Sequence, residues 1–167
     1  LDAMLASSLL NDTEKVRPKA RRELAQKNRL GTKAIDFTYT LATGKTGSLH
    51  ALKAPYTLLF ISNPGCYACI ETIDALKNAP AIGRALSAKQ LQILSIYPDE
   101  ELDEWKRHLT DYPADWINGY DRNQVIKMQN LYDLKAIPTL YLLSKDKTVL
   151  LKDVTAMDIE QFLDSSK

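Results

Sequence analysis

Two cysteines separated by two residues are the side chains of this sequence best suited to covalent chemistry. Cys66 and Cys69 are the only cysteines among the 167 residues, and Tyr67 and Ala68 stand between them. A nearly continuous apolar run over residues 56–61 and a Pro-Gly turn come directly before this pair. Such a run indicates a buried strand, so the cysteines are expected at a junction between a strand and a helix.

Cys66 stands where a helix is expected to begin, because Cys69, Ile73 and Leu76 have helical spacing. The free N–H groups and the positive dipole end at that position favour a thiolate over a thiol. We therefore expect Cys66 to be the nucleophile. Cys69, one turn later on the same face, is expected to be buried deeper and to close a disulfide with it. Such a pair accepts or donates two electrons through a mixed disulfide with a substrate.

Other kinds of site share this spacing. Two cysteines placed in this way also occur as a static disulfide, as two unrelated buried thiols and at the start of zinc sites. Zinc requires about four ligands, whereas the only histidines, His50 and His108, lie far apart in the sequence. We therefore expect no metal and no cofactor, and the static disulfide stays open at this point.

Composition narrows the class of protein. With 45% hydrophobic and 26% charged residues, the chain is typical of one ordinary globular domain. Its longest apolar stretches, such as 58–61 and 140–143, are far shorter than the roughly 20 residues that cross a bilayer. Residues 1–10 show neither the basic nor the apolar segment of a signal peptide, so the compartment is inferred from chemistry.

Charge argues against a nucleic-acid partner. The net charge is +1, which does not favour general binding to polyanions. Residues 14–29 hold seven basic side chains against two acidic ones, but no aromatic residue lies among them. A solvated helix face is the expected role of this segment.

An N-terminal helical arm is expected over residues 1–30, because apolar residues recur there at helical spacing. Pro18 predicts either a kink or a helix that starts near it, since proline removes a backbone donor. Gly31 is expected to cap the end of the arm. The remainder, residues 31–167, is expected to form one domain.

That domain is predicted to alternate strands and helices. We expect a hairpin over 36–52, strands over 56–61 and 91–97, helices over 69–76, 82–88, 99–109 and 121–131, a loop over 112–120, a second hairpin over 139–151 and a last helix capped by Thr155 and Asp158. This order predicts an α/β fold with a central mixed, parallel-rich sheet, helices on both faces and an antiparallel edge. Trp105 and Trp116 are expected to pack in the core.

A second element lies far downstream of the cysteines, where Ile137 and Pro138 stand immediately before an apolar strand. Together with the strand, the Cys-x-x-Cys pair and the helix, it resembles the thioredoxin superfamily. The resemblance is closest to extracytoplasmic thiol-disulfide oxidoreductases of the TlpA/ResA type and covers about residues 34–163. It implies a thioredoxin-like fold, with a cis bond between Ile137 and Pro138 beside the cysteines.

The resemblance also implies the activity. Cys66 would be the attacking thiol, Cys69 the resolving thiol, and Ile137-Pro138 the edge against which a substrate segment lies. The partners would be cysteine-containing proteins and an upstream thiol that donates electrons, in the periplasm or another extracytoplasmic compartment. From its place between the cysteines, Tyr67 is expected to shield the disulfide and to offer partners an aromatic surface.

This sequence departs from the family pattern at several positions. Family members commonly have Trp where Gly65 stands, and Gly-Pro or Glu-Pro between the cysteines. Phe60 occupies the position where many thioredoxins have a buried acid, six residues before the first cysteine. Glu71 is the nearest carboxylate and is expected to point elsewhere. These departures support an alternative: a non-catalytic thioredoxin-like binding domain with a structural disulfide, for which the helical arm serves as a docking element.

Overall fold

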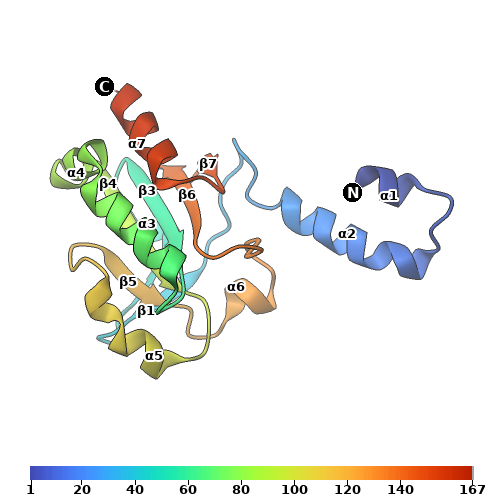
Figure 1. The fold of residues 1–167 in the computed structure, drawn as a ribbon, viewed down its shortest axis with the longest axis horizontal. Helices are drawn as coiled ribbons and strands as arrows, with labels where there is room; N and C mark the ends of the chain where they lie inside the picture. The colour runs from blue at the N-terminus through green and yellow to red at the C-terminus, as the bar shows by residue number, and fades with distance from the viewer. Residues whose placement is uncertain (167) are drawn as a thin grey trace.

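The computed structural model describes residues 1–166, which form a central sheet covered by helices and a pair of helices that project from it (Figure 1). The strands are β1 (Thr38–Leu41), β2 (Thr46–Ser48), β3 (Tyr56–Ile61), β4 (Leu91–Tyr97), β5 (Ile117–Tyr120), β6 (Thr139–Ser144) and β7 (Val149–Lys152). The helices are α1 (Asp2–Ala6), α2 (Asp12–Gln26), α3 (Tyr67–Asn78), α4 (Pro80–Ser87), α5 (Leu102–Arg107), α6 (Val125–Met128) and α7 (Ala156–Ser165), with the short 3-10 helices η1 (Leu49–Ala51) and η2 (Leu109–Asp111).

The sheet is mixed, as expected, with the strand order β2-β1-β5-β4-β3-β6-β7. Only β3–β4 and β4–β5 pair in parallel, and the other neighbours are antiparallel. The prediction of a parallel-rich sheet was therefore wrong, because both hairpins extend the sheet in the antiparallel sense. The loop predicted over 112–120 also contains β5, a strand of four residues whose Asn-Gly pair hides the strand pattern.

Side chains of the central strands alternate between two apolar layers, because successive residues of a strand point to opposite faces. Leu58 and Phe60 pack beneath α3, α4 and α7. Leu59 and Ile61 pack on the other face against Ile126 of α6 and neighbouring loops. Helices cover both faces, as predicted, but on the second face α6 and η1 are short and irregular segments supply most of the cover (Figure 1).

Several helices start where their end residues predict. The backbone N–H of Asp158 donates to Thr155 Oγ1 over 3.3 Å and the Thr155 N–H donates to Asp158 Oδ2 over 2.7 Å, which confirms the predicted start of α7. Pro80 occupies the first turn of α4, where its missing N–H costs nothing. Trp105 and Trp116 are buried, as predicted.

The N-terminal segment is helical, but its boundaries differ from the prediction. A capping box of Asn11 and Glu14 starts α2, which continues through Pro18 without a break. The prediction for Gly31 was wrong, because α2 already ends at Gln26. Gly31 instead lies in a later turn with φ +77°, and its N–H donates to Val149 O. Figure 1 shows α1 and α2 projecting away from the sheet.

Three other segments are shorter or different from their predictions. The second half of the first hairpin turns into η1 after Ser48. The helix expected over 99–109 is α5 followed by η2, and the helix expected over 121–131 is the four-residue α6. Asp121 nevertheless stabilises the start of α6, since its Oδ2 accepts the Ile126 N–H over 2.7 Å.

Candidate thiol site

The two sequence elements singled out for chemistry meet at one edge of the sheet. In the antiparallel pair of β3 and β6, Ile61 lies opposite Thr139. The chain therefore leaves β3 toward Cys66 at the same edge where Pro138 leads into β6. The bond between Ile137 and Pro138 is cis, as the resemblance implied.

A tight turn delivers Cys66 to the start of α3. Gly65 has φ +66°, a left-handed conformation that glycine adopts without a steric cost. Cys66 is the N-cap of α3 and is partly exposed, and its Sγ accepts the backbone N–H of Cys69 over 3.3 Å. The predicted position of Cys66 at a helix start is thus confirmed, and its sulfur faces the free N–H groups there.

Cys69 lies one turn deeper and is only 1% exposed, as expected. Both cysteines are free thiols. Burial raises the pKa of the Cys69 thiol to about 12, and its hydrogen bond with Cys66 acts in the same direction. A backbone hydrogen bond from Asn63 lowers the pKa of Cys69 and is outweighed. The pair therefore combines one accessible sulfur with one that strongly prefers to stay protonated.

The surroundings of Cys69 are mainly apolar. Phe60 is fully buried and packs edge-on against Trp116, with 6.0 Å between ring centroids. Within residues 1–166, no carboxylate contributes to the pKa of Cys69. Ser62 and Tyr112 supply polar groups on this side, because their hydroxyl oxygens are 2.9 Å apart. Neither residue was predicted as part of the site, although strand alternation from Leu58 and Phe60 places Ser62 on this face.

Tyr67 lies at the surface beside the thiols and is 75% exposed. A hydrogen bond with the Glu71 carboxylate raises the pKa of Tyr67. Glu71 therefore faces the tyrosine hydroxyl rather than the buried thiol, in agreement with its expected direction. The exposed ring leaves an aromatic surface next to Cys66.

His108 lies beside the turn at Gly65 that precedes Cys66, which the sequence did not reveal. Its Nε2 is 3.7 Å from the point that a Cβ on Gly65 would occupy. The imidazole bonds Glu104 Oε1 over 3.0 Å and Asp111 Oδ2 over 2.7 Å. The hydrogen bonds to Asp111 and then to Glu104 raise the pKa of His108. A histidine held between two carboxylates thus borders the turn.

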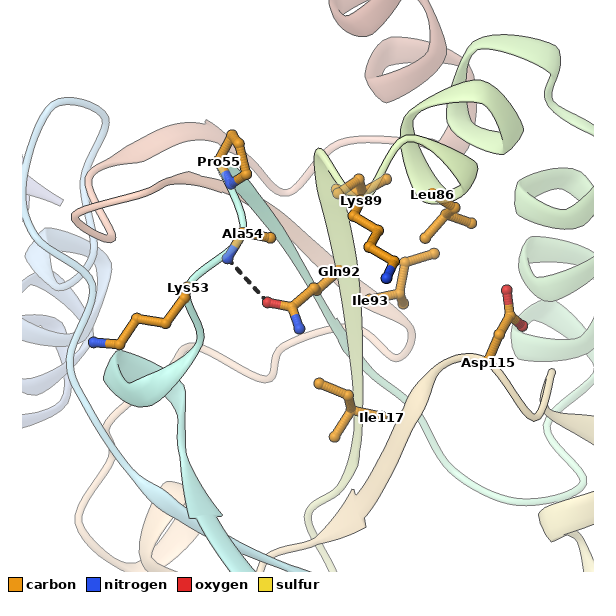
Figure 2. A pocket seen from close by; sticks show the side chains of 10 residues that line it. Lys53, Ala54, Pro55, Leu86, Lys89, Gln92, Ile93, Asp115 and Ile117 are labelled. Carbon is orange, nitrogen blue, oxygen red and sulfur yellow. Dashed lines mark hydrogen bonds between the residues drawn. The ribbon is translucent and has the colours of Figure 1, made fainter.

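A separate cavity of about 460 Å³ lies at the opposite end of the sheet. Figure 2 shows Pro55 and Gln92 there, at the starts of β3 and β4, with Asp115 across the cavity. The Ala54 N–H donates to Gln92 Oε1 over 3.1 Å. Because Cys66 follows the end of β3, this cavity is not the thiol site.

The described residues offer neither a metal site nor a membrane-spanning helix. Residues 1–166 contain no group of three or more His, Cys, Asp or Glu side chains arranged to hold a metal ion. In the same residues, no helix has the length and apolar character needed to cross a membrane.

Comparison with known proteins identifies relatives of the whole chain. Residues 55–149 match the sequence model of a family described as thioredoxin-like. A crystal structure of a thioredoxin-like protein from Bacteroides caccae is 63% identical, with a TM-score of 0.97 over 99% of this chain and 60% of that chain. The present chain therefore spans less than two thirds of that relative.

Shorter relatives cover the sheet and its helices. The C-terminal domain of an uncharacterized protein from Bacteroides fragilis is 62% identical over 82% of this chain and 98% of that chain, with a TM-score of 0.81. The thioredoxin domain of a thiol-disulfide oxidoreductase from Bacteroides vulgatus, 19% identical over 83% of this chain and 97% of that chain, shares the fold with a TM-score of 0.71. No curated protein matches the sequence. The predicted thioredoxin-like fold is confirmed.

Proposed function

Because the chain belongs to the thioredoxin-like family, we propose that it is a thiol-disulfide oxidoreductase that exchanges electrons with protein cysteines through Cys66 and Cys69. The observation that carries this proposal is the contrast between the two sulfurs. Cys66 is a partly exposed N-cap whose sulfur accepts an N–H bond, and Cys69 is a buried thiol one turn behind it. An attacking thiol must be accessible and easily ionised, as Cys66 is placed to be. A resolving thiol must lie close to the attacking sulfur, as Cys69 does.

The proposed exchange proceeds in two steps. The Cys66 thiolate attacks one sulfur of a substrate disulfide, so that a mixed disulfide forms and the other substrate sulfur leaves as a thiolate. Cys69 then loses its proton and attacks Cys66 Sγ. The Cys66–Cys69 disulfide forms, the second substrate sulfur leaves, and two electrons have passed from the protein to the substrate. The reverse sequence oxidises a substrate dithiol.

We assign the substrate surface to the residues that surround the exposed sulfur. Tyr67 offers an aromatic ring next to Cys66. Ile137 and Pro138 directly precede β6, at the edge of the sheet where β3 leads to the cysteines. An extended substrate segment between these two sides would present its cysteine to Cys66. The proposed partners are cysteine-containing proteins and an upstream thiol donor.

The proposed compartment is extracytoplasmic, in line with the resemblance to TlpA/ResA-type proteins, and the periplasm is the first candidate. Fractionation of cells that produce the whole protein tests this assignment. Recovery of the protein with the cytoplasmic fraction alone would contradict it.

A second candidate function is a thioredoxin-like binding domain whose cysteines only stabilise the fold. Phe60 favours it, because the buried side chain at the expected acid position is fully apolar and cannot accept the proton of Cys69. If the protein is an exchange enzyme, the same apolar side chain predicts that the Cys66–Cys69 disulfide closes slowly, whereas a pure binding domain would show no catalysed exchange. Kinetic assays with cysteine variants therefore separate the two functions.

Cysteine substitution in a disulfide-reduction assay with insulin tests the proposal. Cys66→Ser is expected to lower turnover to the uncatalysed rate, since no attacking thiolate remains. Cys69→Ser is expected to retain the first attack and to accumulate mixed disulfides, which a mass shift in non-reducing gels detects. Wild-type rates in both variants would rule out the exchange activity and favour the binding domain.

A further inference from the structure

A pair of buried hydroxyl groups lies behind the thiols and has no part in the exchange described above. Ser62 Oγ and Tyr112 Oη are 2.9 Å apart, and the two residues are 1% and 7% exposed. Ser62 directly follows β3, whereas Tyr112 follows η2. A buried hydroxyl without a hydrogen-bond partner is costly, and the bond between Ser62 and Tyr112 gives each hydroxyl a partner. It also brings two hydroxyl hydrogens into an apolar layer.

This hydroxyl pair faces the same layer as the resolving thiol. Ser62 continues the alternation of Leu58 and Phe60, which point toward α3. Tyr112 and Cys69 belong to one cluster of buried side chains. The pKa of Tyr112 is raised to about 12, mainly by burial, and a negative charge on Cys69 raises it further. The phenol and the thiol therefore share one apolar layer, in which a charge on the sulfur acts on the phenol.

The Cys69 thiolate has few other groups to stabilise it. Its burial disfavours the charged form, whereas a backbone hydrogen bond from Asn63 lowers its pKa. Cys66 is a second titratable group close to Cys69, and its charge opposes ionisation of the Cys69 thiol. Asp111 acts on Tyr112, again in the direction that opposes negative charge. A further hydrogen-bond donor would therefore have a large effect on the resolving step.

The hydroxyl pair has one hydrogen to spare. Two hydroxyl groups carry two hydrogens, and the bond between Ser62 and Tyr112 uses one of them. In residues 1–166, neither oxygen makes another hydrogen bond to a side chain or to the backbone. If Ser62 donates to Tyr112 Oη, the phenol hydrogen is free to point to a third atom.

We propose that the Ser62–Tyr112 pair stabilises the Cys69 thiolate while it attacks the mixed disulfide. The inference rests on the proposed exchange function and adds a role for residues outside the Cys-x-x-Cys segment. Ser62 acts as a positioning residue, because its O–H donates to Tyr112 Oη. The Tyr112 O–H then donates to the Cys69 sulfur as negative charge develops there. Hydrogen bonds in such a chain strengthen one another, and bonds to charged acceptors are the stronger ones.

A single-turnover reaction with dithionitrobenzoate separates the two thiol steps. In the first step Cys66 attacks the reagent disulfide, forms a mixed disulfide and releases one coloured thiolate. In the second step the Cys69 proton passes to water, Cys69 attacks Cys66 Sγ, and the second coloured thiolate leaves as the protein disulfide closes. The first phase depends on reagent concentration and the second does not.

Tyr112→Phe and Ser62→Ala are expected to slow only the second phase, by about three- to tenfold. Loss of one charge-assisted hydrogen bond lowers the thiolate fraction about ten- to a hundredfold, and the higher nucleophilicity of a more basic thiolate offsets about half of this on a logarithmic scale. The limb of the pH profile over which the second phase accelerates is expected to lie about half to one pH unit higher than in the wild type. The second phase of the double variant should lie within about twofold of that of Tyr112→Phe, because the two hydroxyls act as one unit.

Tyr132→Phe is the matched control. It also removes a buried tyrosine hydroxyl with one hydrogen bond, to Ile35 O over 2.6 Å, but this residue belongs to the opposite layer of the sheet. Both phases should keep their wild-type rates in this variant. Equal second phases in wild type, Tyr112→Phe and Ser62→Ala would overturn the role of the hydroxyl pair while the exchange function stands. A wild-type protein without a second phase would overturn both.

Discussion

The sheet with its covering helices and the N-terminal helices α1 and α2 are stabilised by different interactions. In the sheet, every side chain from Leu58 to Ile61 is fully buried. In α1 no residue is buried, and in α2 only Pro18 is. Lys27, which directly follows α2, donates from Nζ to the carbonyls of Gln129 and Asn130.

This difference means that the two regions contribute very differently to the stability of the protein. Apolar burial supplies most of the free energy of folding, so the region that contains the thiols carries the stability that positions them. The N-terminal helices are joined to it by polar bonds, whose net contribution is small. Substitutions in the two regions should therefore change the stability of the protein by very different amounts.

Phe60→Ala should have the largest effect. It leaves a cavity between β3 and Trp116 and is expected to lower the free energy of unfolding by about 3 to 5 kcal/mol. Leu9→Ala is the control in the N-terminal segment, where the side chain is 91% exposed and a change within about 0.5 kcal/mol is expected. Urea unfolding of both variants makes the comparison. Equal losses would show that the contrast between the regions is false.

Alkaline pH should destabilise the sheet with its covering helices, because buried acidic groups lie on both of its faces. The pKa of Cys69 is raised from its ordinary 9.0 to about 12, and burial also raises the pKa of Tyr112, Tyr132 and Tyr141. Between the two pKa values of such a group, the unfolded chain has lost a proton that the folded chain keeps, so stability falls as pH rises. The loss begins near pH 9 for Cys69 and near pH 10 for the tyrosines.

Melting temperatures measured from pH 7 to pH 11 check this expectation. In Cys69→Ala, the alkaline loss should be smaller by about 1 to 2 kcal/mol, because one of the raised groups is gone. A melting temperature that stays constant from pH 9 to pH 11 would contradict the raised pKa values.

Gly65→Ala should have a smaller and more local effect. An alanine at φ +66° costs about 1 to 2 kcal/mol, whereas its Cβ would make only ordinary contact with His108. Gly83→Ala is the matched control, because Gly83 lies inside α4 with open space around it and should gain up to about 1 kcal/mol. Thermal unfolding compares the two. A gain in both variants would argue against strain at the Cys66 turn.

Removal of residues 1–10 should have the smallest effect. This segment contains α1, which an exposed ion pair between Asp2 and Arg22 helps to join to α2. Turnover in the insulin assay is expected to stay within about twofold, and the free energy of unfolding within about 0.5 kcal/mol. A tenfold loss of turnover would give the N-terminal helices a part in the reaction and break the proposed separation.

The sequence predicted best those features that depend on local pattern. The strand over 56–61, the helix start at Cys66 and the cap at Thr155 all follow from spacing and end residues within a few positions. The cis bond before Pro138 followed from the family resemblance. Failures occurred where tertiary contacts override such patterns. β5 pairs in parallel with β4 despite its Asn-Gly pair, and α2 continues through Pro18.

The candidate site shows the same division. The positions of Cys66 and Cys69 were predicted because one helical turn relates them. Tyr112 and His108 were not, because they approach the thiols from segments about 40 residues away in the sequence, and no periodicity encodes that approach. Phe60 could be identified as a departure, but only the structure reveals which polar groups lie on its side of the sheet.

A redox titration of the Cys66–Cys69 pair tests the central claim most directly. The whole protein is equilibrated with glutathione or dithiothreitol buffers of known potential, and free thiols are counted by alkylation and mass. We expect the pair to convert between dithiol and disulfide within the range of roughly −180 to −300 mV, where exchange proteins operate. A disulfide that stays closed throughout that range, and opens only at lower potential, would contradict the account and identify a structural cross-link.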